Sequence, residues 1–186
     1  MASVNTKDKL VSATARLVWE KGYFGTGIQE VLKRAGVPKG SLYHHFPTGK
    51  DELVIAALHH SSKRMMGKFE NAMRGTKTPV KGLQAIMEVL AQEMEDTGFV
   101  YGCPLATVAL EMSGGKPEIQ DVCKGLYQMW EDALAGYLAL KQIPGSRPKA
   151  TTFLTLLEGG FILSKAHQDA TFLRRLKNGI ELLIEN

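Results

Sequence analysis

The sequence predicts an all-α fold of about nine helices, in which a small N-terminal helix-turn-helix domain precedes a larger helical domain. Three observations indicate this class. Apolar residues recur at the i, i+3, i+4 and i+7 spacing of a helix face along most of the chain. Glycine and proline stand at the ends of these apolar stripes, where helices begin and end. No segment shows the apolar–polar alternation of a strand.

The first predicted helix covers residues 6–22, with an inward face formed by Leu10, Thr14, Leu17 and Val18. The second begins at Ile28, and its apolar stripe consists of Ile28, Val31, Leu32 and Ala35. Thr26 or Gly27 is expected to cap this helix, with Gln29 or Glu30 as the partner in a capping box. Gly36 ends it, because a left-handed residue after a helix costs least for glycine.

A third short helix follows Val37-Pro38 and ends before Pro47. Leu42 and Phe46 face inward at i and i+4, which leaves polar side chains on its other faces. A helix of this kind fits the major groove of DNA, where each base pair shows a distinct donor and acceptor pattern. The spacing alone is equally compatible with a helical hairpin whose polar face is solvated.

The remaining predicted helices cover residues 50–75, 79–97, 102–112, 117–140, 149–167 and 170–184, with a loop at 143–148. The acidic start of the first of them, Asp51-Glu52, suits the positive end of a helix. The stretch Gly75–Pro79 is the clearest break in the chain. We therefore expect a DNA-binding domain at 1–50, a connecting helix at 51–75, and an effector-binding and dimerisation domain at 76–186.

Residues 8–58 resemble the N-terminal domain of the TetR/AcrR family of bacterial repressors. The resemblance rests on Tyr23-Phe24, Thr26, Ala35-Gly36-Val37, the run Lys-Gly-Ser-Leu-Tyr-His-His-Phe at 39–46, and Lys50-Asp51-Glu52-Leu53. Gly27, the extra residue within Pro47-Thr48-Gly49, and the run 101–105 resemble the LmrA/YxaF-type branch. Members of that branch respond to drugs or plant-like aromatic compounds.

The resemblance implies a ligand-responsive, homodimeric repressor that binds double-stranded operator DNA. Lys39, Tyr43, His45 and Lys50 are expected to contact phosphates. Gln29, Ser41 and His44 are expected to reach base edges. Thr26 would both cap its helix and touch a phosphate, and Gly40 completes the predicted DNA-binding set. Two such domains about 34–36 Å apart would read successive major grooves, and an effector that prefers another spacing would release the DNA.

The last two predicted helices each carry an apolar stripe, and the resemblance favours a four-helix dimer interface built from this pair. The predicted interface residues are Phe153, Leu157, Gly160, Phe161, Phe172, Leu176, Ile180 and Leu183. Gly159-Gly160 would let another helix approach closely, although each glycine costs about 1 kcal/mol in helix propensity. The alternative is that both stripes close the core of a single chain.

The second domain is rich in methionine and aromatic side chains, which pack around irregular or planar compounds. The expected lining of an apolar or aromatic effector pocket is Met65, Phe69, Met87, Leu90, Tyr101, Cys103, Leu105, Tyr127 and Trp130. Taken singly, each of these residues also fits an ordinary core. The charge of the effector cannot be read from the sequence.

Composition favours a cytoplasmic DNA-binding protein over other classes. Residues 1–77 hold 13 Lys and Arg against 6 Asp and Glu, and residues 78–186 hold 10 against 13, which matches the overall net charge of +4. No apolar run suggests a signal peptide or a membrane span. Cys103 and Cys123 fit packing better than a sensor, and the adjacent histidine pairs His44-His45 and His59-His60 do not chelate a metal. No cofactor is expected.

No catalytic motif supports an enzyme, since nucleophile elbow, phosphate loop, zinc motif and paired carboxylates are all missing from the sequence. The remaining alternative for the second domain is a helical small-molecule binding or interaction module without effector-controlled DNA release. The operator sequence, the regulated genes, the effector and the number of dimers per operator are not encoded in any motif.

Overall fold

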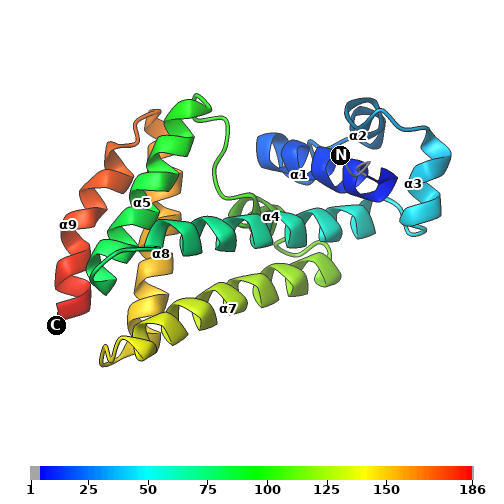
Figure 1. Ribbon diagram of the computed structural model, residues 1–186. Helices are drawn as coiled ribbons and strands as arrows, with labels where there is room; N and C mark the ends of the chain where they lie inside the picture. Colours follow the sequence, from blue (N-terminus) through cyan, green and yellow to red (C-terminus); the bar gives the residue numbers. More distant parts are fainter. Residues whose placement is uncertain (1–4, 186) are drawn as a thin grey trace. The chain divides into compact units, whose positions relative to one another are not determined.

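A computed structural model describes residues 5–185, and within them the chain forms nine α-helices and no strand (Figure 1). The helices are α1 (Thr6–Lys21), α2 (Ile28–Ala35), α3 (Lys39–His45), α4 (Lys50–Met73), α5 (Pro79–Asp96), α6 (Pro104–Glu111), α7 (Pro117–Leu140), α8 (Ser146–His167) and α9 (Thr171–Glu185). The all-α prediction is confirmed. The predicted domain limits at residues 1 and 186 lie outside the described part of the chain.

The chain divides into two compact units that are not the two halves of the sequence. The first unit extends to Arg64 and also includes Pro104–Lys124, whereas the second consists of Met65–Cys103 and the chain from Gly125 onward. Two helices, α4 and α7, contribute residues to both units. Residues 104–124 were expected in the effector-binding domain, and the contacts group them with the helix-turn-helix instead.

The first unit is organised around a core to which α1, α2, α3 and α4 all contribute. Its buried members are Leu10, Val11, Ala13, Leu17, Val31, Leu32, Leu42, Phe46 and Leu53, with Ile28 and Ala35 packed against them. These are the apolar stripes that the sequence predicts for the first three helices. Burial of a Leu or Phe side chain stabilises a fold by about 1.5–3 kcal/mol, so this core fixes how α3 is presented.

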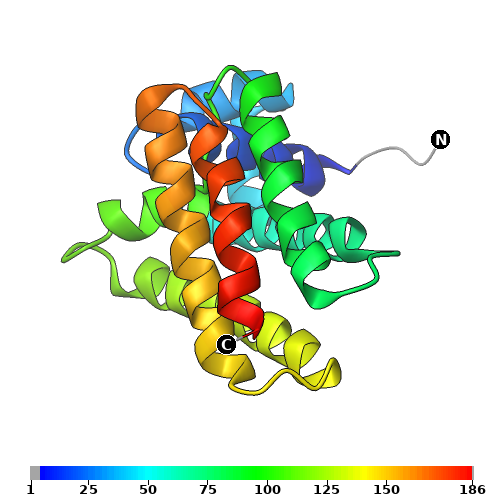
Figure 2. The ribbon, with the colours of Figure 1, turned by 90° about the vertical axis from the view of Figure 1, so that its left-hand side faces the viewer.

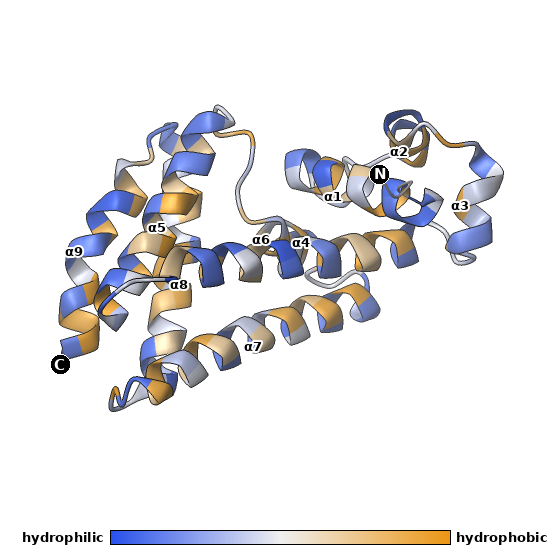
Figure 3. Cartoon of the chain, viewed as in Figure 1, coloured by the Kyte–Doolittle hydropathy of each residue, from blue (hydrophilic) through white to orange (hydrophobic). Residues whose placement is uncertain are grey.

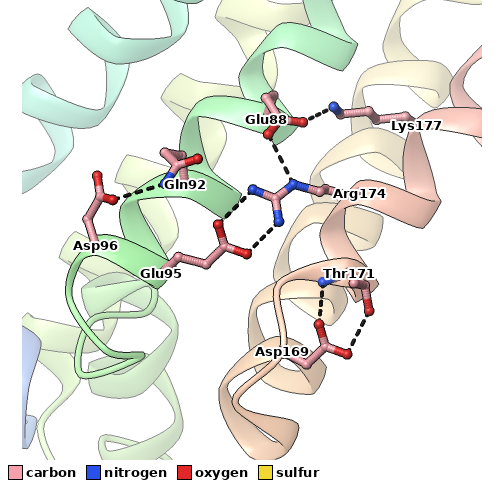
Figure 4. Close-up of polar contacts among 8 residues, drawn as sticks. All are labelled: Glu88, Gln92, Glu95, Asp96, Asp169, Thr171, Arg174 and Lys177. Carbon is pink, nitrogen blue, oxygen red and sulfur yellow. Dashed lines mark hydrogen bonds and ion pairs between the residues drawn. The ribbon is translucent and has the colours of Figure 1, made fainter.

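In the second unit, α5, α8 and α9 lie side by side (Figure 2). The contact between α5 and α9 includes a charged network (Figure 4). The Arg174 guanidinium donates to Glu88 at 3.0 Å and to Glu95 at 2.8 Å, and Lys177 pairs with Glu88. A guanidinium shared between two carboxylates fixes the register of α9 along α5, because its donors are planar and rigid.

Two local features differ from the sequence prediction. The loop expected at 143–148 is shorter, because α8 begins at Ser146 and Pro148 occupies its first turn, where a missing backbone N–H costs nothing. The helix expected from residue 102 begins at Pro104. Elsewhere the ends of the helices agree within one or two residues. Figure 3 shows α2 and α3 with hydrophilic and hydrophobic stretches on different faces, as the amphipathic pattern predicts.

Candidate functional site

The turn between α2 and α3 has the geometry that the sequence predicts. Gly36 adopts a left-handed conformation with φ of 66°, and its N–H bonds to the carbonyl oxygens of Leu32 and Lys33 at the end of α2. Pro38 is the N-cap of α3. Leu42 and Phe46 are 0% and 2% exposed, so they hold α3 against the core. The opposite faces of α3 are thereby turned toward solvent.

Most predicted DNA-binding residues lie on that solvent side. Exposed side chains or backbone are found at Gln29, Lys39, Gly40, Tyr43 and His44, while Ser41, His45 and Lys50 are half-buried. Half of the Tyr43 surface is exposed. The rings of His44 and His45 meet edge to face at 4.8 Å between centroids. The structure thus gathers hydrogen-bond donors and a lysine on one short helix.

Of the two residues predicted to cap α2, Gly27 is the N-cap and Thr26 is not. Thr26 is 1% exposed, and its hydroxyl donates to the Gly22 carbonyl oxygen at 2.6 Å. Gly27 is the N-cap of α2 and makes no side-chain cap bond. Glu30 does not close a capping box, because it pairs with Lys21 at 2.7 Å. Threonine frequently bonds to a carbonyl four residues back, which competes with capping. Its burial makes Thr26 the least accessible member of the predicted DNA-binding set.

Lys50 lies at the start of α4 beside an interaction that the sequence did not predict. Its ammonium lies 4.2 Å from the centre of the Tyr23 ring, and burial lowers the pKa of Lys50. The Tyr23 hydroxyl donates to Asp51 at 2.5 Å, and Lys116 also donates to Asp51 at 2.5 Å. Burial raises the pKa of Asp51, but the hydrogen bonds from Lys116 and Tyr23 outweigh it and the pKa is lowered overall.

Residues 104–124 contact the end of α1 through a second carboxylate. Glu111 accepts a hydrogen bond from the Tyr23 backbone N–H at 2.6 Å. The same carboxylate lies against Gly22, where a Cβ atom would come within 2.4 Å of its Oε1. Gly22 also has φ of 71°, which favours glycine. Position 22 therefore requires glycine both for its backbone conformation and for the space beside Glu111. Glu111 and Lys116 are about 90 residues from α1 in sequence, and no local pattern relates them to it.

In the second unit, the structure brings together four of the residues predicted for the pocket. Phe69 meets Trp130 at 6.1 Å between ring centroids, and Trp130 meets Tyr127 at 5.6 Å, both edge to face. The Cys103 Sγ lies 3.9 Å from the Tyr127 hydroxyl oxygen. We call Phe69, Tyr127, Trp130 and Cys103, together with Glu158, the aromatic cluster.

Glu158 is the member of this cluster that sequence reasoning missed. Its Oε1 accepts a hydrogen bond from the Tyr127 hydroxyl at 3.0 Å. Its position on α8 follows no apolar stripe, so a solvated side chain was the natural expectation. Burial, the largest influence, raises the pKa of the Glu158 carboxyl. Desolvation combined with the neighbouring carboxylate and thiol also raises the pKa of Tyr127.

The other predicted pocket residues are not members of the aromatic cluster. Met65, Met87 and Leu90 are buried, and Tyr101 is half-buried. Leu105 belongs to the first unit. The second unit also holds a groove of about 380 Å³, a volume within the range of small-molecule sites. It is lined by Met66, Phe69, Glu70, Met73, Asp132, Ala133, Leu134, Gly136, Tyr137 and Leu140.

The predicted dimer residues fall into two groups. Phe153, Leu157, Phe161 and Ile180 are at most 5% exposed in the single chain, so they belong to its core, the alternative that the sequence left open. Phe172, Leu176 and Leu183 are half-buried. The first two lie in an apolar groove of about 280 Å³ along α8 and α9, whose lining also includes Thr155, Leu156, Gly159, Gly160, Leu163 and Arg175.

Neither metal nor thiol chemistry is indicated in the part of the chain that the structure describes. No group of three His, Cys, Asp or Glu side chains there is placed to hold a metal ion. Cys103 and Cys123 are both buried and form no disulfide, and burial raises the pKa of Cys123 to about 11. A buried thiol with a raised pKa is a poor nucleophile. Among residues 5–185, no helix combines the length and apolar character of a membrane span.

Two protein-family models match the chain. The model described as bacterial regulatory proteins, tetR family, matches residues 10–57, and the model described as transcriptional regulator LmrA/YxaF-like, C-terminal domain, matches residues 79–178. The regulator LmrA of Bacillus subtilis is 30% identical over 187 residues, with full coverage of both chains. The uncharacterised regulator YxaF of the same organism is 29% identical and covers 97% of this chain and 95% of its own.

Solved structures show the same fold. A TetR transcriptional regulator from Legionella pneumophila has a TM-score of 0.85 at 19% identity, covering 99% of this chain and all of its own. A regulatory protein TetR from Rhodobacter sphaeroides has a TM-score of 0.83 at 23% identity, and the match covers 92% of this chain and 95% of the other. The families and the relatives matched by sequence are transcriptional regulators, in agreement with the prediction that the chain is not an enzyme.

Proposed function

The chain belongs to the TetR family of transcriptional regulators, with a C-terminal domain of the LmrA/YxaF-like type, and we propose that it is a homodimeric repressor released from its operator by a small aromatic effector. The observation that carries the proposal is the exposed face of α3. It presents Lys39, Tyr43 and His44 on a helix whose other side is anchored by Leu42 and Phe46. Because such a repressor binds chromosomal DNA, the protein would act in the cytoplasm.

Effector control is supported by the second unit. The aromatic cluster offers ring edges and faces for a planar compound. Because α4 and α7 each contribute residues to both units, a change in either helix at the cluster is carried by a continuous backbone toward Lys50 and Lys116. An effector that prefers a second arrangement of these helices would lower the population competent for DNA. The alternative, a binding module without DNA release, predicts no such coupling.

The proposal is tested by a gel shift on the DNA that flanks the gene for this protein. The shift is measured over a salt series, because affinity for phosphates falls steeply as salt rises. It is repeated with a panel of planar aromatic compounds. We expect a discrete, salt-sensitive complex that one of the compounds releases. A folded dimer that selects no sequence from a random DNA pool would contradict the DNA-binding assignment. An operator complex that no effector ever releases would favour the alternative.

Gln29 on α2 is proposed to read a base edge. Its side chain is exposed, so Gln29→Ala is expected to leave the fold intact. Removal of a base contact costs about 1–3 kcal/mol at the preferred base and relaxes specificity there. Selection from random DNA with both proteins measures this. Equal losses of affinity on operator and random DNA would sink the base-reading role.

The α8–α9 groove is proposed to be covered by the same groove of a second copy. Around Gly159 an added Cβ meets nothing within 4 Å, whereas at Gly160 it would lie 2.5 Å from a Leu173 methyl of the same chain. Gly159→Leu is therefore expected to block dimerisation with a folded monomer, and Gly160→Ala to destabilise the monomer itself. Sedimentation velocity combined with thermal unfolding separates the two. A fully dimeric Gly159→Leu protein would place the interface elsewhere.

A further inference from the structure

The Glu158 carboxylate has one oxygen without a partner. Oε1 accepts the hydrogen bond from the Tyr127 hydroxyl, but Oε2 is inaccessible to solvent and has no hydrogen-bond partner. A buried polar atom left unpaired costs about 1–3 kcal/mol, and more when it is charged. Such atoms are rare in folded proteins and call for an explanation. One explanation is a ligand that donates a hydrogen bond to Oε2.

The surroundings of Glu158 do not neutralise it. The groups that contact its carboxyl are the Tyr127 hydroxyl and the Cys103 thiol, and neither is a basic group. Its pKa is raised chiefly by burial, and the side chains that offset this rise, Cys103 and Tyr127, are not basic groups. Two other acidic groups of the second unit, Glu88 and Glu95, pair with Arg174. Glu158 is thus a half-buried acid whose Oε2 is shielded from solvent and has no hydrogen-bond partner.

The aromatic rings beside Glu158 favour the same kind of ligand. Tyr127 donates directly to the carboxylate and meets Trp130 edge to face, and Trp130 in turn meets Phe69. Aromatic faces attract cations, most strongly when the site is desolvated. Phe69 also lines the groove of about 380 Å³, whereas the other members of the cluster do not.

We propose that Glu158 is the recognition residue for a planar organic cation, whose protonated nitrogen donates to Oε2 while its rings pack among Phe69, Tyr127 and Trp130. This rests on the proposed function, in which the second unit binds the effector, and adds the charge of that effector. A neutral aromatic compound would gain the ring contacts alone. An anionic compound would be repelled by the carboxylate.

Two acridines of the same ring system provide the test. Proflavine is a planar cation at neutral pH, whereas acridine is largely neutral. We expect isothermal titration of the full chain without DNA to show proflavine bound at least about tenfold more tightly than acridine, the effect of one charge-assisted hydrogen bond. In Glu158→Gln the preference should fall to near unity with acridine affinity unchanged. Acridine binding then also reports that the variant is folded.

Two further variants keep the test decisive. Glu70→Gln removes the carboxylate that lines the 380 Å³ groove and should leave the preference unchanged. Tyr127→Phe keeps the Glu158 charge and should retain the preference even if Glu158→Gln fails to fold. Equal binding of both acridines by the unaltered chain, a preference that survives Glu158→Gln, or a preference lost in Glu70→Gln would each overturn the proposal.

The outcome separates this inference from the proposed function. Because proflavine intercalates into DNA, all titrations use protein alone, and the operator gel shift is scored independently. An operator complex released only by neutral or anionic compounds would overturn the role of Glu158 and leave the repressor assignment standing. A proflavine preference that depends on Glu158 in a protein without operator binding would support the role of Glu158 and overturn the repressor assignment.

Discussion

Replacing Lys39 by alanine is expected to weaken every DNA complex of this regulator and to flatten its salt dependence. Lys39 is the first residue of α3 and is exposed, so its loss removes charge without opening the core. Each phosphate contact contributes about −0.9 to the slope of log affinity against log salt, and a dimer loses two of them. The slope should therefore fall by about 2. Affinity should fall roughly tenfold to a hundredfold, since each contact is worth on the order of 1 kcal/mol.

The matched control is Lys141→Ala, which removes an exposed lysine just after α7 in the second unit. Gel shifts of both variants on operator and random DNA across a salt series provide the comparison. The two DNA classes should lose affinity alike for Lys39→Ala, because phosphates carry no sequence information. An unchanged slope for Lys39→Ala, or an equal change for Lys141→Ala, would remove Lys39 from the DNA interface.

Lys50 is a poorer probe of phosphate binding than the sequence suggested. Its ammonium lies over the Tyr23 ring, where a cation–π contact contributes about 0.5–1 kcal/mol, so alanine there would disturb the fold as well as the DNA contact. Nothing in the sequence around residue 50 shows this, because Tyr23 is 27 positions away. The exposure of Lys39 agrees with the role that its motif predicts. The role of a residue with a distant partner is not readable from its motif.

The same distinction explains which parts of the fold were predictable. Helix positions follow from local spacing and from glycine and proline, and Gly36 illustrates this with its left-handed turn. Thr26 was misread because two local hydrogen bonds compete for one hydroxyl, and sequence does not rank them. The grouping of residues 104–124 with the helix-turn-helix depends on Glu111 and Lys116, whose partners are long-range. Glu158 was missed for the same reason.

Gly22→Ala is expected to destabilise the first unit strongly. Gly22 has φ of 71° and ψ of −171°, a region open essentially to glycine, and strain there costs about 1–3 kcal/mol. The new Cβ would also lie 2.4 Å from Glu111 Oε1. A carboxylate at the end of a side chain could move away, but it would then lose its hydrogen bond from Tyr23, worth about 1.5–3 kcal/mol. The total is roughly 3–5 kcal/mol, a melting point lower by about 10 °C.

A double-mutant cycle separates the two contributions. Glu111→Ala removes the clash and the hydrogen bond together, so in its background Gly22→Ala should cost only the backbone strain. The double variant should therefore lose less stability than the sum of the losses of the two single variants. Gly36→Ala is the matched control, because it too has positive φ, 66°, but an added Cβ there meets nothing within 4 Å. Its cost of about 1–2 kcal/mol should be the same with or without Glu111. Additive losses for Gly22 and Glu111 would mean that the carboxylate does not rest on this turn, and that residues 104–124 do not brace the end of α1.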